Sequence, residues 1–377
     1  MLHTVGAPFP EWTWKFLTLP WQPFEGILRM LRRMKYRTVL LDEYREIVLA
    51  GRLGKERVVA LTFDDGYCDN WVYASVLLER YNACGTVFMS GDFIDPGQTV
   101  RPRWDGSPDG EKPFSDGFLN VAELKQLDKS GILDVQSHCM THTWYPSGPE
   151  IVDFRHPGDP YHWMDWNDSP GTKWERVQPV SRPETWGEPV YAHQKALNGP
   201  RYFPNPAITD GLRQFAADRG EGFFNTPDWK RQLEEKAREL QMSMESGTME
   251  SESDFQTRID AELRDSATLL SGILDKKVTW LCWPGGGYSE AVFNAAARYY
   301  TGTTISSSFD GKHQQGLDAL GCFRFCRFGA LTTGPNERLR YMGPLTNCLY
   351  IEERRTGSKP CRLIRGGLTR LAQWGVL

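Results

Sequence analysis

Two short segments of the sequence contain side chains whose types and spacing suit a metal site. Asp64 and Asp65 end the apolar run in "VVALTFDDGYCDN". His138 and His142 lie four residues apart in "SHCMTH", a spacing that brings two imidazoles within reach of one ion in a helical turn or compact loop. One carboxylate and two imidazoles leave coordination positions open for water and substrate, which is typical of a catalytic metal site rather than a structural one.

The adjacent aspartates need a special position to act together. Within a strand, neighbouring side chains point to opposite faces, so two successive carboxylates do not converge. Asp64 and Asp65 follow the apolar run 57–63 and precede Gly66, which places them where the strand ends and strict alternation stops. "DDG" alone is common in turns, and a lone histidine on an apolar face is more often a hydrogen-bonded core residue than a ligand. The two segments together favour a metal site.

The elements that must position these side chains alternate between strand and helix. Apolar and β-branched runs predict strands, and apolar residues at helical spacing predict helices. Asn120 and Glu123 form a capping-box pattern that starts one helix, and Gly131 ends it. Strands that alternate with helices indicate a parallel sheet. The predicted strands are 1–6, 38–44, 57–63, 85–91, 132–138, 277–287 and 301–308, and the predicted helices are 25–36, 69–82, 120–132, 255–275 and 289–300.

The segment 143–253 has a different character and is predicted to be an insertion on one face of the fold. Its first part is rich in Pro, Gly, Asp and Trp and lacks clear periodicity, and its later part contains the helical stretch 228–244. We expect the acidic stretch 245–254 to be a mobile hinge. The predicted division is 1–142 and 254–345 for one discontinuous domain, 143–253 for the insertion and 346–377 for a C-terminal tail.

Aromatic residues of the insertion suggest sugar stacking, but we expect most of them to form the insertion's own core, with one or two exposed at a cleft. They include Trp144, Tyr161, Trp163, Trp166, Trp174, Trp186 and Trp229. His156, His162 and Asp165 are candidates for an auxiliary site, although surface hydrogen bonding is the favoured interpretation.

"TFDDGY" followed by "SHCMTH" resembles the first two motifs of the polysaccharide deacetylases, carbohydrate esterase family four, which share the NodB-homology fold. The resemblance covers about residues 1–142 and 262–330 and implies an α/β fold, a distorted (β/α) barrel. It also implies that Asp64 is the general base, and that Asp65, His138 and His142 bind a divalent metal, usually zinc and sometimes cobalt or nickel. In such a site a metal-activated water attacks an acetyl carbonyl.

The third and last motifs depart from the common family pattern. In "CWPGGGY", Cys282 stands where the family often has arginine, and Gly285 stands where it has an aromatic residue. The family's oxyanion donor is a main-chain N–H at that last position, which Gly285 still supplies, whereas the arginine that tunes the base is lost. The late histidine that supplies the general acid is not recognisable. The candidates for this role are His3, His313, His156, His162, His193 and the protonated base itself.

We therefore expect a hydrolase that removes an acetyl group, N-acetyl before O-acetyl, from a sugar, polysaccharide or glycan precursor. Hydrolysis of a small non-sugar amide on the same fold is one alternative, since a fold does not fix a substrate. A non-catalytic glycan-binding protein that keeps the metal as a structural ion is another. A free second carboxylate at Asp64 counts against that version.

Composition limits the partners. Lys and Arg total 44 and Asp and Glu total 48, so the formal charge is −4, and no basic stripe indicates nucleic-acid binding. The chain contains neither a long apolar run nor an export signal, and its eight cysteines form no CxxC pair, so we expect a cytoplasmic protein with reduced thiols. For the basic tail, packing on the barrel is favoured over contact with an anionic membrane.

Overall fold

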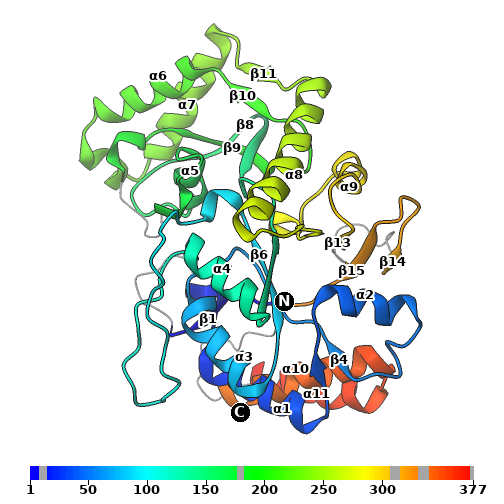
Figure 1. Cartoon of the computed structure of the whole chain (residues 1–377). Coiled ribbons are helices and arrows are strands. Elements are labelled where there is room, and N and C mark those ends of the chain that lie inside the picture. Colours follow the sequence, from blue (N-terminus) through cyan, green and yellow to red (C-terminus); the bar gives the residue numbers. More distant parts are fainter. Residues whose placement is uncertain (8–14, 176–181, 306–314, 330–338, 374–377) are drawn as a thin grey trace.

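The computed structural model describes the chain except for residues 8–14, 176–181, 306–314, 330–338 and 374–377. A curled, largely parallel sheet with helices on its outside forms the lower part of the molecule in Figure 1. A lobe built by the inserted segment stands above it, and the last two helices lie beneath it.

The main sheet has seven strands in the order β14-β15-β13-β12-β7-β6-β5. Its neighbouring strands are parallel except for the antiparallel pair of β14 and β15. The carboxyl ends of the parallel strands therefore meet at one edge, where the site lies. The sheet is a curled half-barrel, which confirms the predicted fold class. Its strands are β5 Thr62–Phe63, β6 Gly85–Met89, β7 Leu133–Ser137, β12 Trp280–Leu281, β13 Gly302–Ile305, β14 Gly316–Leu317 and β15 Phe323–Cys326.

Two short parallel pairs extend the half-barrel. They are β1 Thr4–Gly6 with β2 Thr18–Pro20, and β3 Arg37–Thr38 with β4 Val58–Val59. Leu2 forms a parallel bridge to Phe63 of β5, so the start of the chain lies beside the edge of the main sheet.

The helices of the half-barrel mostly follow the sequence signals. Asn120 and Glu123 form a full capping box at the start of α4, and Gly131 ends that helix in the left-handed conformation with φ 72°. The predicted strand 38–44 is wrong beyond Thr38, because Leu41 begins a helix in which Asp42 and Glu43 lie at the positive N-terminal end. The helices are α1 Trp21–Arg33, α2 Leu41–Leu49, α3 Ser75–Tyr81 after a π-helical turn at Asn70–Ala74, α4 Val121–Ser130, α8 Glu252–Leu274 and α9 Glu290–Ala296.

The insertion contains more strand than its sequence indicates. Its elements are β8 Trp144–Phe154, α5 His162–Asn167, β9 Pro189–Lys195, β10 Tyr202–Pro204, α6 Pro206–Ala217, α7 Trp229–Ser243 and β11 Gly247–Met249. The antiparallel pair of β8 and β9 is interrupted by register shifts, which hid it from a search for strict alternation. The expected hinge is also wrong, because β11 pairs with β10 and Ser251 caps α8 through a hydrogen bond from the Asp254 N–H.

The core of the insertion lobe is formed mainly by aliphatic residues and phenylalanine, and not by the tryptophans of the insertion. Its buried members are Phe154, Ile208, Leu212, Ala216, Phe223, Leu233 and Ala237. Trp229 packs at the edge of this cluster, whereas Trp166 belongs to the core of the half-barrel. The prediction of an aromatic insertion core is therefore wrong for Trp166.

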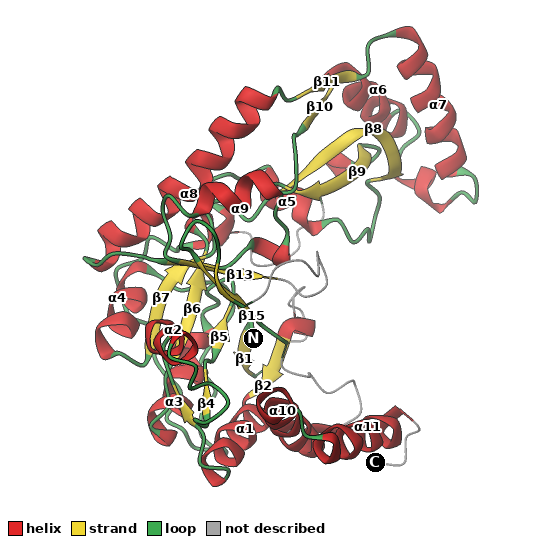
Figure 2. Cartoon of the chain, turned by 90° about the vertical axis from the view of Figure 1, so that its right-hand side faces the viewer, coloured by secondary structure: helices red, strands yellow, loops and turns green. Residues whose placement is uncertain are grey.

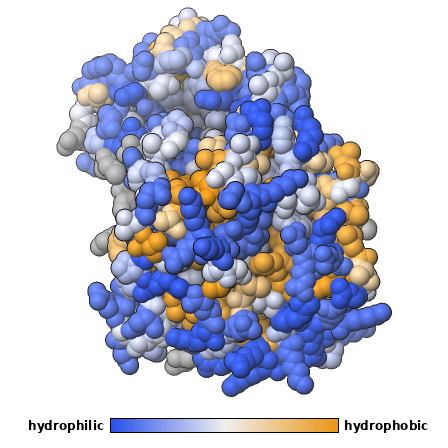
Figure 3. Space-filling model, viewed as in Figure 1, coloured by the Kyte–Doolittle hydropathy of each residue, from blue (hydrophilic) through white to orange (hydrophobic). Residues whose placement is uncertain are grey.

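The C-terminal segment forms α10 Leu339–Thr356 and α11 Lys359–Gln373, and α10 packs along α1. A cavity of about 930 Å³ lies between these helices and the open side of the half-barrel. None of the described helices has the length and apolar character needed to cross a membrane. The surface in Figure 3 is mainly hydrophilic, with apolar residues gathered below the insertion lobe and along the right-hand side.

Candidate metal centre

Asp65, His138 and His142 converge on one point at the carboxyl edge of the sheet. Asp65 Oδ1 lies 3.2 Å from His138 Nε2 and 3.3 Å from His142 Nε2. Asp65 is the second residue after β5 and adopts φ 72°, which turns its carboxylate out of the strand direction. Asp65 Oδ1 is buried and has no hydrogen-bond partner within the described part of the chain. An oxygen and two imidazole nitrogens in this arrangement fit a divalent ion.

The loop after β7 holds the two imidazoles. His138 Nδ1 lies 2.8 Å from the Cys282 carbonyl oxygen, so it donates its proton there and Nε2 remains available as a ligand. Cys139 and His142 have positive φ angles of 62° and 45°, which fold the segment into a compact loop rather than a helical turn. Glu262 of α8 accepts the backbone N–H groups of Met140 and Thr141 at 3.0 and 3.1 Å and thereby fixes the loop.

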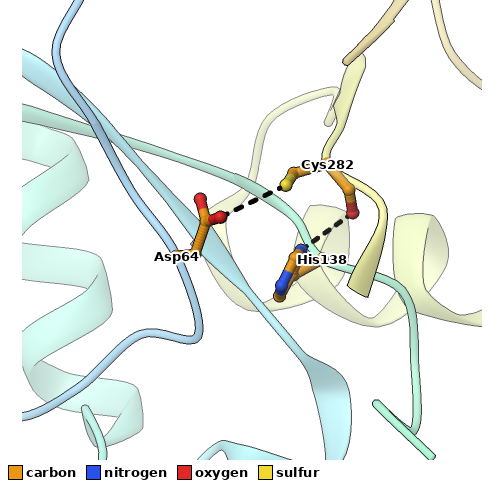
Figure 4. A group of neighbouring side chains, drawn as sticks. All are labelled: Asp64, His138 and Cys282. Carbon is orange, nitrogen blue, oxygen red and sulfur yellow. Dashed lines mark hydrogen bonds between the residues drawn. The ribbon is translucent and has the colours of Figure 1, made fainter. Parts of the chain in front are cut away.

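Asp64 faces a different partner. Its two carboxylate oxygens accept hydrogen bonds from Arg327 at 2.5 and 2.9 Å, and the Cys282 thiol lies 3.6 Å from Oδ2. Arg327 also lies 2.7 Å from the sulfur. Figure 4 shows the Cys282 thiol directed toward the Asp64 carboxylate and the Cys282 carbonyl group directed toward the His138 imidazole. Asp64 therefore lies beside the three metal-ligand candidates. Its ion-pair partner, Arg327, is not one of them.

Arg327 is the residue that the sequence analysis missed. It follows β15 directly and is 263 residues away from its partner Asp64. Arg327 thus contacts Asp64 from another strand, and the Cys282 side chain adjoins both. The only local signal was an arginine at the end of a strand, where barrel enzymes place functional groups.

The charges around Asp64 and Asp65 keep both carboxylates ionised. Burial raises the pKa of Asp64, but Arg327 outweighs that effect and lowers the pKa to about 2. Burial also opposes ionisation of Asp65, and His142 and His138 shift its pKa well below the usual value. The pKa of His138 is raised well above its usual value, because the neighbouring Cys282 and Asp65 outweigh burial. These neighbours therefore favour the protonated form of His138 in the metal-free protein.

The third-motif segment meets the insertion. Gly285 has φ 55°, and a Cβ atom there would lie 2.8 Å from Lys195 Cε. Lys195, the last residue of β9, donates a hydrogen bond to the Gly285 carbonyl oxygen. The space that an aromatic side chain would need at position 285 is therefore taken by a lysine from the insertion. The Gly285 N–H stays a candidate oxyanion donor.

The candidate proton donors are placed differently. His3 follows Leu2, whose carbonyl oxygen accepts the Asp64 N–H at 2.9 Å, so the segment that carries His3 adjoins the centre. His193 contacts Trp163 with ring centroids 4.5 Å apart, and His156 contacts Trp229 at 5.0 Å. His162 begins α5. His313 falls outside the described residues.

The residues suggested for an auxiliary site are not brought together. Asp165 forms an ion pair with Arg155 at 3.2 Å, and His156 hydrogen-bonds the Pro157 carbonyl group at 3.0 Å. Within the described residues, these side chains do not form a cluster of metal-ligand geometry.

Comparison with known proteins finds similarity to one family over part of the chain. The model of the polysaccharide deacetylase family matches residues 52–159, a range that contains Asp64, Asp65, His138 and His142. YxkH of Bacillus subtilis (strain 168), named provisionally as a polysaccharide deacetylase, is 28% identical over 126 residues, which cover 33% of this chain and 38% of YxkH. The match thus spans well under half the length of that relative. These findings confirm the resemblance to the polysaccharide deacetylases.

Solved structures give the fold. A de-N-acetylase from Aggregatibacter actinomycetemcomitans aligns with a TM-score of 0.50 and 13% identity over 86% of this chain and 91% of that one. The deacetylase domain of BpsB from Bordetella bronchiseptica aligns with a TM-score of 0.45 and 17% identity over 79% and 81% of the two chains. The first alignment shows that the predicted barrel type is correct.

Proposed function

The chain contains a polysaccharide deacetylase domain, and from this premise we propose that it hydrolyses an acetyl group, N-acetyl before O-acetyl, on a sugar or glycan. The observation that carries the proposal is the convergence of Asp65, His138 and His142 beside a second carboxylate, Asp64. A structural ion would not need that second carboxylate, so its presence favours catalysis over glycan binding alone.

Asp65, His138 and His142 would hold the divalent ion, with zinc the first choice for one oxygen and two nitrogen ligands. When bound, such an ion acts as a Lewis acid and lowers the pKa of a water from 15.7 to about 7. Asp64 takes the proton of the attacking water, since it is ionised and Arg327 holds its orientation. The Gly285 N–H donates to the developing oxyanion.

Protonation of the leaving amine requires an acid close to the same point. His3 lies on the segment whose Leu2 carbonyl oxygen accepts the Asp64 N–H. We assign it as the first candidate for the proton donor. Asp64, once it carries the proton of the water, is the second candidate.

The test is release of acetate from N-acetylated and O-acetylated sugars and from a small non-sugar amide. Protein stripped of metal and reloaded with zinc, cobalt or nickel should release acetate from the sugars, and the Asp64→Asn variant should lose at least about 10²-fold in rate. Circular dichroism checks that the variant is folded. Turnover of the non-sugar amide alone would reject a glycan substrate, and no acetate release under any metal loading would reject the deacetylase.

A further inference from the structure

One face at the base of the β8–β9 hairpin adjoins the metal centre and has no part in the chemistry described above. Trp144 pairs with Lys195 across the two strands, and His193 lies two residues before Lys195 on the same face. Trp163 of α5 packs over this face, with its ring centroid 4.5 Å from that of His193 and 6.5 Å from that of Trp144. We call Trp144, Trp163, His193 and Lys195 the hairpin platform.

Two contacts connect the hairpin platform to the metal centre, one through Trp166 and one through Lys195. Trp166, three residues after Trp163 on α5, contacts the ring of His142 with centroids 6.5 Å apart. At the other end, Lys195 hydrogen-bonds the Gly285 carbonyl group and lines a small pocket with His142 and Gly287. Figure 1 shows α5 and the hairpin where the insertion lobe meets the half-barrel. A group held on the platform would therefore adjoin the acetyl group under attack.

The platform rings are only partly covered. Trp144, Trp163, His193 and Lys195 are all half-buried, in contrast to Trp166, which is 6% exposed. Aromatic rings that pack on one another but stay half-buried present a rigid apolar face next to polar edges. The C–H face of a sugar ring is complementary to such a surface.

Lys195 gives the platform an uncompensated positive charge. Its ammonium group lies 5.5 Å from the centre of the Trp144 ring and hydrogen-bonds a carbonyl oxygen, and within the described residues no carboxylate forms an ion pair with it. Gly285 and Gly287 make its position possible, because Cβ atoms there would lie 2.8 and 2.4 Å from its side chain. A half-buried cation without an anion beside it favours a negatively charged ligand.

We propose that the hairpin platform is a substrate subsite that holds the sugar unit next to the acetylated one, and that it selects a unit carrying a negative charge. The inference rests on the proposed function for the position of the acetylated sugar. The aromatic rings stack on the neighbouring sugar, and Lys195 pairs with its carboxylate or phosphate group. The preferred substrate class is thus an acidic N-acetylated glycan.

Binding without turnover tests the subsite. Zinc-loaded protein carrying Asp64→Asn is titrated in a calorimeter with hyaluronan tetrasaccharide, which alternates N-acetylglucosamine with a uronic acid, and with neutral chitotetraose. Metal-stripped wild-type protein serves as a second background if the variant does not fold. Sugar phosphates replace the uronate in a parallel arm to distinguish the two sources of charge. The acidic oligosaccharides should bind more tightly than chitotetraose.

Variants separate the roles of ring and charge. Lys195→Met should weaken binding of the acidic tetrasaccharide by about fivefold and leave chitotetraose unchanged. Trp163→Ala should weaken both by about tenfold, and Trp163→Phe should restore most of the loss. Lys236→Met, on α7 where Lys236 pairs with Glu239, is the matched control and should change neither.

Equal affinity for acidic and neutral oligosaccharides would overturn the charge selection, and so would an equal effect of Lys195→Met on both. Unchanged binding in Trp163→Ala would overturn the subsite itself. Because these readouts need no turnover, a protein that binds through the platform but releases no acetate would refute the proposed function and leave the subsite standing.

Discussion

At the scale of single residues, the centre depends on a charge that comes from a distant part of the chain. Asp64 is 4% exposed, and an isolated buried carboxylate would take up a proton or lower the stability of the fold. Arg327 prevents both through two hydrogen bonds. The pair therefore keeps the proposed base ionised and fixed, although position 282 holds a cysteine.

Replacing Arg327 by Gln should destabilise the protein by about 3–5 kcal/mol, because it leaves a buried carboxylate unpaired. The double variant Asp64→Asn, Arg327→Gln should recover part of that loss, since it removes both charges. Urea unfolding monitored by circular dichroism measures the free energies. Arg231→Gln, which removes two exposed ion pairs at the start of α7, is the control and should cost less than about 1 kcal/mol. Additive effects of the two buried changes would show that the pair does not interact.

Metal affinity should depend on pH through His138. Its pKa is raised well above the usual value in the metal-free protein, so below that pKa the ion must displace a proton from Nε2. Affinity for zinc should therefore rise by about tenfold per pH unit below that pKa and level off above it. Titration calorimetry at pH 6, 7 and 8 in buffers of different ionisation enthalpy measures the affinity and the released proton. Affinity that does not change with pH would show that His138 is neutral before the ion binds.

At the scale of elements, α8 controls the geometry of the histidine loop. Glu262 accepts two backbone N–H groups and the Thr141 hydroxyl group, so a helix that begins directly after the insertion fixes the segment between His138 and His142. Burial raises the pKa of Glu262, but the Thr141 side chain and the loop N–H groups favour its ionised form. Glu262 thus fixes the loop that carries both histidines.

Glu262→Ala should lower zinc affinity by about 10- to 100-fold, the usual effect of removing a group that orients metal ligands. Glu262→Gln keeps one acceptor oxygen and should have a smaller effect. Equilibrium competition with a chromogenic chelator measures the affinity. Asp265→Ala, an exposed substitution on the same helix, should leave the affinity unchanged. Equal losses in Glu262→Ala and Asp265→Ala would assign the effect to α8 as a whole.

Some helices and strands could be predicted from the sequence and others could not. The start and end of α4 were predicted correctly because Asn120, Glu123 and Gly131 act within one or two turns of the helix. The strand predicted at 38–44 was wrong because a short apolar run fits either state, and burial of Leu41 and Ile47 against the rest of the fold decided for helix. The contacts of Arg327 and Lys195 depend on residues far along the chain, and no local pattern encodes them.

At the scale of the whole molecule, the centre is assembled from segments that are separate in sequence. The ends of β5, β7, β12 and β15 supply the aspartates, the histidines, Cys282 and Arg327, and the end of β9 brings Lys195 from the insertion. The first two motifs were recognisable because each lies within six residues. The remaining parts become visible only when the sheet order is known.

The C-terminal helices lie on the open side of the half-barrel. Substitutions at two glycines can test whether α10 packs on α1 as described. A Cβ atom at Gly26 in α1 would lie 2.7 Å from Cγ of Pro344 in α10, whereas Gly272 in α8 has nothing within 4 Å. Alanine at a helix interior gains up to about 1 kcal/mol over glycine, but overpacking against a rigid proline ring costs about 1–3 kcal/mol. Gly272→Ala should therefore stabilise the protein, and Gly26→Ala should destabilise it by about 1 kcal/mol in urea unfolding. If both substitutions stabilise equally, α10 does not hold this position against α1 in solution, and the cavity beneath the half-barrel is open to solvent.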